Sequence, residues 1–168
     1  MSAAKPVRSL FFNKNAAHNW LVPWHQDMTI CVNQKVELAG YSKWTLKNGA
    51  HHVEPPTDVL DKMLTLRIAM DAANHENAAL KVLAGSHRHG KLKGTQLDIY
   101  MENATEADMH ICTMLAGDVL LIKPLLLHAS EKAMKADQRR VLHLEFSATV
   151  LPAPMHWAEA ERISGPKN

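Results

Sequence analysis

The chain is divided into short apolar runs of strand length, separated by turn-forming and polar residues. Several runs alternate apolar and polar residues with the two-residue period of a half-buried strand. Gly, Pro, Asn and Asp stand between them, where they favour turns. The runs that we expect to be strands lie at residues 7–13, 28–33, 64–70, 79–85, 110–115, 119–123, 125–130 and 140–148.

Two segments depart from this pattern. Residues 56–64 open with Pro-Thr-Asp, a typical helix start, so we expect a short helix there. Residues 94–104 fit a helix or an irregular segment equally well. Many short strands with few helices predict an all-β-rich fold of the sandwich, jelly-roll or barrel type.

Length and charge narrow the classes of function. The 168 residues suit a single domain (1–168), and 46% hydrophobic residues can build a core. A net charge of +2 gives no reason to expect nucleic acid or an anionic membrane as partner. No apolar run approaches the roughly 18 residues of a membrane helix, and the start of the chain lacks a signal-peptide core. Cys31 and Cys112 have no C-x-x-C spacing, so we expect buried free thiols in a soluble, cytoplasmic protein.

One pair of polar residues stands just ahead of an apolar run. His25 and Asp27 lie two apart, so on a strand their side chains would share one face and Gln26 would point the other way. His128 ends a second apolar run and is the best third ligand. Two histidines and one carboxylate form the facial triad of non-haem Fe(II) oxygenases, which leaves coordination positions open. The triplet alone also recurs by chance, in which case His25 is an ordinary histidine beside a turn aspartate.

An oxygenase that consumes 2-oxoglutarate must also hold the distal carboxylate of that dicarboxylate. A buried arginine suits this task because its charge is permanent and its donors are bidentate. Arg139 and Arg140 begin the last expected strand and must face opposite ways, so only one can enter the core. We interpret Arg140 as the solvated member of the pair.

Three blocks of the sequence resemble one known family. "NWLVPWHQDMTICV", "LKVLAGSHRHGKL" and "PLLLHASEKAMKADQRRVLHLEFSA" are similar, in the same order, to the bacterial branch of the phytanoyl-CoA dioxygenase family. The resemblance covers nearly the whole chain. It implies an Fe(II)- and 2-oxoglutarate-dependent dioxygenase on a double-stranded β-helix (jelly-roll, cupin-like) core. Such an enzyme uses dioxygen, hydroxylates a small organic substrate and releases succinate and CO2.

The resemblance also implies roles for individual residues. His25, Asp27 and His128 match the catalytic iron ligands of the family. The family arginine, eleven residues beyond the distal histidine, falls on Arg139, and a serine two residues after that histidine is Ser130. Both would bind 2-oxoglutarate. Gln26 also lies near the cosubstrate in relatives, which conflicts with the strand geometry that points it away.

Three further residues precede or follow the triplet. Arg67 falls where relatives line the 2-oxoglutarate pocket, and a carboxylate of cosubstrate or substrate would explain an arginine inside an alternating strand. A salt bridge to a neighbour such as Asp71 or Glu145 explains it equally well. Lys14 and Asn19 would border the site.

Most of the other histidines are expected to lie in turns, loops or structural positions rather than to bind a metal. Residues 87–89 of "GSHRHG" are expected to shape a structural turn rather than a second metal site, and residues 51–52 to lie in a substrate-side loop. Trp44 and Lys47 sit in a Gly-bounded segment that suits a lid over the site, and packing explains them equally well. The remaining candidates are expected to be structural: His110, His143 and His156.

The chain begins only two dozen residues ahead of His25, whereas full-length relatives carry a substantial region there. We therefore expect a short family member that lacks that region. This leaves a second hypothesis, a non-catalytic jelly-roll protein that binds metal or 2-oxoglutarate without turnover. A third, a metal enzyme that ignores 2-oxoglutarate, is disfavoured by Arg139 and Ser130. We expect a small-molecule substrate, and a homo-oligomer is possible.

Overall fold

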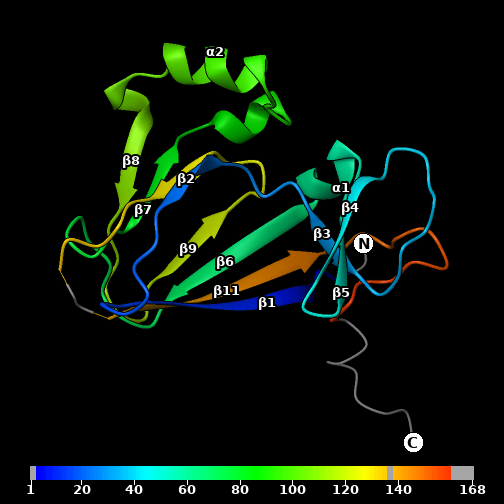
Figure 1. Cartoon of the computed structure of the whole chain (residues 1–168), viewed down its shortest axis with the longest axis horizontal. Coiled ribbons are helices and arrows are strands. Elements are labelled where there is room, and N and C mark those ends of the chain that lie inside the picture. The colour runs from blue at the N-terminus through cyan, green and yellow to red at the C-terminus, as the bar shows by residue number, and fades with distance from the viewer. Residues whose placement is uncertain (1–2, 136–137, 160–168) are drawn as a thin grey trace, which may run out of the picture.

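The computed structural model describes residues 3–135 and 138–159, in which eleven strands form three antiparallel sheets (Figure 1). The predicted strand-rich class is confirmed. The long sheet has the order β1 (Lys5–Lys14), β11 (Arg139–Ser147), β6 (Met63–Ala69) and β9 (Val119–Ile122). The short sheet has the order β2 (Val22–His25), β10 (His128–Ser130), β7 (Leu80–Leu83) and β8 (Met109–Cys112). The small sheet has the order β3 (Ile30–Val32), β5 (Ala50–Glu54) and β4 (Ser42–Lys47).

The long and short sheets enclose the interior that matters for function. Every second residue of β11 is buried, beginning with Arg139 and including His143 and Glu145. The partly exposed residues between them are Arg140 and then Leu142, Leu144 and Phe146. Cross-strand neighbours continue both faces, since His143 pairs with Arg67 and Leu144 with Leu66. The long sheet thus turns charged side chains inward, and its outward apolar side chains include Leu64, Val119 and Leu121. Charged side chains in such an interior are stabilised only by polar or charged partners, which come from the protein or from a ligand.

The main apolar core lies beside this interior rather than inside it. It joins the small sheet, β1, the first helix α1 (Thr57–Asp61) and the segment that follows β11. Its members include Ile30, Val53, Leu60, Met155 and Trp157. The short helix expected within residues 56–64 is confirmed as α1. This core fixes the end of the long sheet from which β6 starts.

A second helix covers the outer side of the short sheet. Residues 94–104, which fitted a helix or an irregular segment, contain α2 (Thr95–Asn103), and Figure 1 shows it beyond β7 and β8. Leu97, Tyr100 and Met101 are spaced along one helix face and pack against Leu83 and Leu127. The other short helices are η1 (Ser86–His89) and η2 (Glu106–Asp108).

The expected strands at 64–70, 79–85, 110–115, 119–123 and 140–148 correspond to β6 to β9 and β11, shifted by a few residues. The run at 125–130 was too long, because only β10 is strand and a turn precedes it. Leu127 donates its backbone N–H to the buried Ser86 Oγ at 2.8 Å, so the structural role expected for the "GSHRHG" turn is confirmed.

The sequence analysis missed one hairpin. Residues 42–54 form β4 and β5 around Asn48-Gly49, both with positive φ (51° and 76°). Such a turn matches the twist of two-residue hairpins and favours Asn-Gly. The loop expected at residues 51–52 is therefore wrong, since both histidines lie on β5. No helix in the described ranges is long and apolar enough to cross a membrane.

Candidate functional site

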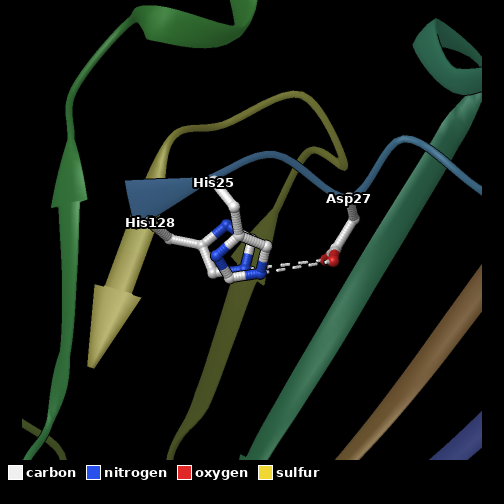
Figure 2. A group of neighbouring side chains, drawn as sticks. All are labelled: His25, Asp27 and His128. Carbon is white, nitrogen blue, oxygen red and sulfur yellow. Dashed lines mark ion pairs between the residues drawn. The ribbon is translucent and has the colours of Figure 1, made fainter. Parts of the chain in front are cut away.

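His25, Asp27 and His128 come together between the long and short sheets (Figure 2). His25 ends β2 and lies opposite His128 of β10 in the antiparallel register, with the two ring centroids 4.2 Å apart. One potential ligand atom from each of the three residues lies within 4.8 Å of the others. The strand expected to carry both His25 and Asp27 is wrong, because β2 ends at His25. Asp27 follows in a loop, whose shape is held by its backbone N–H donating to Pro124 O at 2.8 Å.

Both imidazoles are oriented by backbone carbonyls. His25 Nδ1 lies 2.8 Å from Pro23 O, and His128 Nδ1 lies 2.8 Å from Leu126 O. A carbonyl only accepts hydrogen bonds, so each neutral ring carries its proton on Nδ1 and presents an Nε2 lone pair. These Nε2 atoms lie 3.8 Å and 3.7 Å from the Asp27 carboxylate oxygens. Two lone pairs and a carboxylate directed at one point could hold a metal ion, and the histidines are oriented as metal-bound histidines usually are.

The protonation of His128 supports the same arrangement. Burial lowers the pKa of His128, the Asp27 carboxylate opposes that shift, and the neighbouring His25 adds to it. The ring is only 4% exposed. The neutral form, which binds metals, is therefore favoured at His128.

His25, Asp27 and His128, called the metal group below, line a cavity of about 130 Å³ between the two sheets. Side chains from β1, β2, β6, β7, β10 and β11 contribute to its wall. Its charged members other than Asp27 are four cations and one acid: Arg8, Lys14, Arg67, Arg139 and Glu145. The cavity is therefore strongly positive.

Arg139 is buried in this wall, and no carboxylate of the described residues forms an ion pair with it. The side chain is 4% exposed, and its Nε has no hydrogen-bond partner within the described residues. Burial, reinforced by the nearby Arg67, lowers the pKa of Arg139 to about 10. Arg140 on the opposite face makes a bidentate pair with Asp71 at 2.8 Å and 2.7 Å. The expected opposite orientation of the two arginines is confirmed. The buried guanidinium of Arg139 would be stabilised by an anionic ligand.

Lys14 brings a second buried cation to the same end of the cavity. Its Nζ donates to Ser130 Oγ at 3.0 Å and to Glu131 O at 2.6 Å. Burial, with the positive charge of Arg139, lowers the pKa of Lys14 to about 8. Ser130 Oγ donates to Ala78 O at 2.9 Å, so it meets Lys14 as an acceptor. Lys14 thus lines the cavity, whereas Asn19 bonds the backbone of Ala133 outside it.

Arg67 also reaches the cavity, but through a partner that the sequence did not suggest. Its Nη1 donates to His143 Nδ1 at 3.0 Å. Neither acid expected for a salt bridge pairs with it, since Asp71 binds Arg140 and Glu145 binds Arg8 at 3.2 Å. Burial lowers the pKa of Arg67, and the Asp27 carboxylate opposes that shift, which couples this arginine to the metal group.

His143 lines the cavity, whereas the sequence predicted only a structural role for it. It is 3% exposed and lies on the inner face of β11. The spacing between Arg139 and His143 could have predicted this position, because residues four apart on a strand lie on the same face. Glu145 follows from the same alternation.

Gln26 does not line the cavity. Its amide donates to Gly90 O at 2.8 Å and Leu125 O at 2.6 Å, and it accepts from Leu92 N at 2.8 Å. All of these partners are backbone groups of the loops behind the metal group. Gln26 therefore points away from the cavity, although it lies in the loop after β2 and not on the expected strand.

We expect Gln26→Ala to destabilise the metal-free protein by about 2–4 kcal/mol, because it leaves three backbone groups without partners. Urea unfolding followed by circular dichroism measures this change. The matched control is Gln34→Ala, which removes an exposed amide that donates to Pro154 O, and we expect a change under about 0.5 kcal/mol. Equal effects of the two substitutions would contradict the role of Gln26 as a brace.

Other residues singled out in the sequence lie elsewhere. His87 and His89 belong to η1, and the His89 ring contacts Tyr100 of α2. Trp44 and Lys47 lie on β4, where Trp44 packs against the main core and its ring contacts His51. Neither lines the cavity of the metal group.

Comparison with known proteins identifies the family. Residues 1–141 match the family model described as phytanoyl-CoA dioxygenase (PhyH). No curated protein sequence matches the chain significantly.

Solved structures with the same fold have low sequence identity. The non-heme alpha ketoglutarate dependent carbocyclase SnoK from nogalamycin biosynthesis is 12% identical, with a TM-score of 0.61 over 97% of this chain and 57% of SnoK. EctD from S. alaskensis is 16% identical, with a TM-score of 0.58 over 88% of this chain and 46% of EctD. HygX from Streptomyces hygroscopicus, solved with nickel, 2-oxoglutarate and hygromycin B, is 12% identical, with a TM-score of 0.56 over 89% of this chain and 58% of HygX.

The chain spans about half the length of these structures. Their shared fold is the jelly roll of non-haem iron and 2-oxoglutarate-dependent oxygenases, which confirms the fold class expected from the resemblance. The family match covers the long-sheet strands β1, β6 and β9, the metal group and the start of β11. The chain belongs to the phytanoyl-CoA dioxygenase family.

Proposed function

We propose that the protein is an Fe(II)- and 2-oxoglutarate-dependent dioxygenase that hydroxylates a small organic substrate. His25, Asp27 and His128 would hold the iron on one face and leave the other coordination positions open. One observation supports the proposal most strongly. The oriented Nε2 atoms and the Asp27 carboxylate share a cavity with a buried arginine whose Nε has no hydrogen-bond partner among the described residues.

The residues fit the groups that this function requires. When bound, iron would supply the oxidation of 2-oxoglutarate and substrate by dioxygen, with release of succinate and CO2. Pro23 O and Leu126 O hold the Nδ1 protons of His25 and His128, which fixes the orientation of both rings with Nε2 toward Asp27.

The distal carboxylate of 2-oxoglutarate would bind at the end of the cavity that Arg139 and Lys14 share. Arg139 offers a buried guanidinium with an unused Nε–H. Ser130 holds the Lys14 ammonium in place. Burial lowers the pKa of Lys14, the charge of Arg139 lowers it further, and a dianion placed here would offset this repulsion.

The low pKa of Lys14 predicts a pH dependence of 2-oxoglutarate binding. An anion beside Lys14 raises its pKa, so binding takes up a proton at any pH above the free value of about 8. Affinity should therefore fall as pH rises, by about tenfold between pH 7 and pH 9. Calorimetric titration of the Ni(II) protein measures this change. Lys14→Met should remove the dependence, and an unchanged slope in that variant would contradict contact between Lys14 and the cosubstrate.

The function is tested by anaerobic titration of the purified apo-protein with Fe(II) and then 2-oxoglutarate. The expected result is the weak visible charge-transfer band of a keto acid chelated to iron. No band from a folded protein would overturn the proposal. A band without succinate formation, in air and with a broad panel of candidate substrates, would support the non-catalytic alternative instead.

A further inference from the structure

Arg67 is a second buried arginine without a carboxylate partner within the described residues. It is 8% exposed, and it donates a hydrogen bond to His143, which carries no negative charge. The Phe12 ring lies 5.5 Å from its guanidinium carbon and covers one face of the group. A buried guanidinium supported by an imidazole and an aromatic ring still needs an anion.

His143 adds an unused donor beside Arg67. An arginine can only donate, so His143 Nδ1 accepts from Arg67 and the neutral ring carries its proton on Nε2. That Nε2 is buried and has no hydrogen-bond partner within the described residues. Glu145 Oε1 lies 3.5 Å away without hydrogen-bond geometry, and it is also the partner of Arg8. Arg67 and His143, paired across β6 and β11, thus form a donor group with spare capacity.

Charge counting shows that 2-oxoglutarate alone does not neutralise the cavity. Its wall carries four cations against the carboxylates of Asp27 and Glu145. A divalent metal ion would add two positive charges, and the 2-oxoglutarate dianion would remove two. An excess of two positive charges remains. If Arg139 and Lys14 hold the cosubstrate, one of these charges belongs to the metal with Asp27 and the other to Arg67, since Arg8 pairs with Glu145.

A neighbouring cleft offers room for the rest of a substrate. It measures about 460 Å³ and shares Arg8 and Leu10 with the metal cavity. From the cavity, the contacts run from Arg67 through His143 and Glu145 to Arg8. The remaining wall of the cleft is formed by β3, the hairpin turn at residues 47–50 and residues 158–159. A ligand in the cleft could therefore place one end beside Arg67.

We infer that Arg67 and His143 form a subsite for a carboxylate of the substrate, separate from the Arg139 end that holds 2-oxoglutarate. The inference rests on the proposed function. It names the substrate class as small organic acids that bind with the acidic group inward and the remainder toward the cleft. Arg67 supplies the charge, and His143 supplies a directed N–H.

Binding of a monocarboxylate to the Ni(II) protein saturated with 2-oxoglutarate tests this subsite. The probe is 4,4,4-trifluorobutyrate, observed by fluorine NMR, and 4,4,4-trifluorobutyramide is the uncharged control. We expect the acid to bind and the amide not to bind. Arg67→Gln should weaken binding of the acid by about tenfold or more, since a charged hydrogen-bonded pair is lost. Arg67→Lys keeps the charge and guards against misfolding, so we expect an intermediate affinity.

The readout for 2-oxoglutarate separates the subsite from the cosubstrate anchor. In Arg67→Gln its affinity should stay within about threefold of wild type, and Arg140→Gln on the outer face should change neither ligand. A loss of 2-oxoglutarate affinity in Arg67→Gln would assign Arg67 to the cosubstrate and overturn the inference. Equal binding of acid and amide would also overturn it. Failure of wild type to bind 2-oxoglutarate would instead refute the proposed function.

Discussion

Arg139→Gln should weaken the binding of 2-oxoglutarate to the Fe(II) or Ni(II) protein by about 30- to 5,000-fold. The substitution removes one member of a buried charge pair, and such losses cost about 2–5 kcal/mol. The effect should be large because Arg139 is 4% exposed and water cannot replace its charge. Anaerobic titration of the charge-transfer band, or calorimetry with Ni(II), measures the change.

Arg139→Gln should, in contrast, increase the stability of the ligand-free protein. Arg139 is buried with no ion-pair partner in the part of the chain that the structure describes, and burial together with Arg67 lowers its pKa to about 10, which reflects the unfavourable environment of the charged form. The shift corresponds to about 3 kcal/mol. Because glutamine also loses some packing of the longer side chain, we expect a net stabilisation of about 1–2 kcal/mol. With 2-oxoglutarate at 100 times the wild-type dissociation constant, wild type should gain about 2.7 kcal/mol and the variant at most about 0.9 kcal/mol. The stability advantage of the ligand-free variant therefore disappears or reverses when ligand is added.

Arg140→Gln is the matched control, since it removes a guanidinium from the next residue on the opposite face. Arg140 is paired with Asp71 and does not line the cavity. We expect 2-oxoglutarate affinity within about twofold of wild type and only a small loss of stability, because an exposed ion pair contributes little. If ligand-free Arg139→Gln were instead as destabilised as a broken ion pair, Arg139 would have a counter-ion and the anchor role would lose its basis.

The long sheet explains why part of this site could be predicted from sequence and part could not. Period-two alternation correctly separated Arg139 from Arg140. It does not say which face is inside, and the usual expectation of apolar residues inward would have buried Leu142 and Leu144. The structure places His143 and Glu145 inside instead. Only the resemblance to a family with a polar cavity indicated the correct face.

The metal group shows a different limit of sequence reasoning. The three residues were identified correctly as neighbours, yet the strand geometry offered as the reason was wrong for Asp27. A loop held by Pro124 O brings the carboxylate to the histidines, and no local pattern in residues 25–28 encodes a partner so distant in sequence. The same applies to Lys14, whose Ser130 contact joins residues 116 positions apart. Local periodicity predicts faces, whereas the convergence of loops depends on tertiary contacts.

His128→Ala should lower the affinity for divalent metal by about 100-fold or more. Loss of a supporting hydrogen bond to a ligand already costs about 10–100-fold, and this substitution removes a ligand itself. His128 is the most buried of the three, and its Nδ1 is held by Leu126 O. His25 and Asp27 both come from the β2 side of the cavity, so neither can take the coordination position that His128 leaves empty.

Metal-dependent stability gives a direct measurement of this loss. At a Ni(II) concentration of 100 times the wild-type dissociation constant, wild type should gain about 2.7 kcal/mol in urea unfolding. A variant that binds 100-fold more weakly should gain only about 0.4 kcal/mol under the same conditions. His110→Ala, which removes an exposed histidine on β8, should keep the full gain. The same gain in His128→Ala would place the metal elsewhere, whereas a loss shared with Asp27→Asn would assign both residues to one metal site.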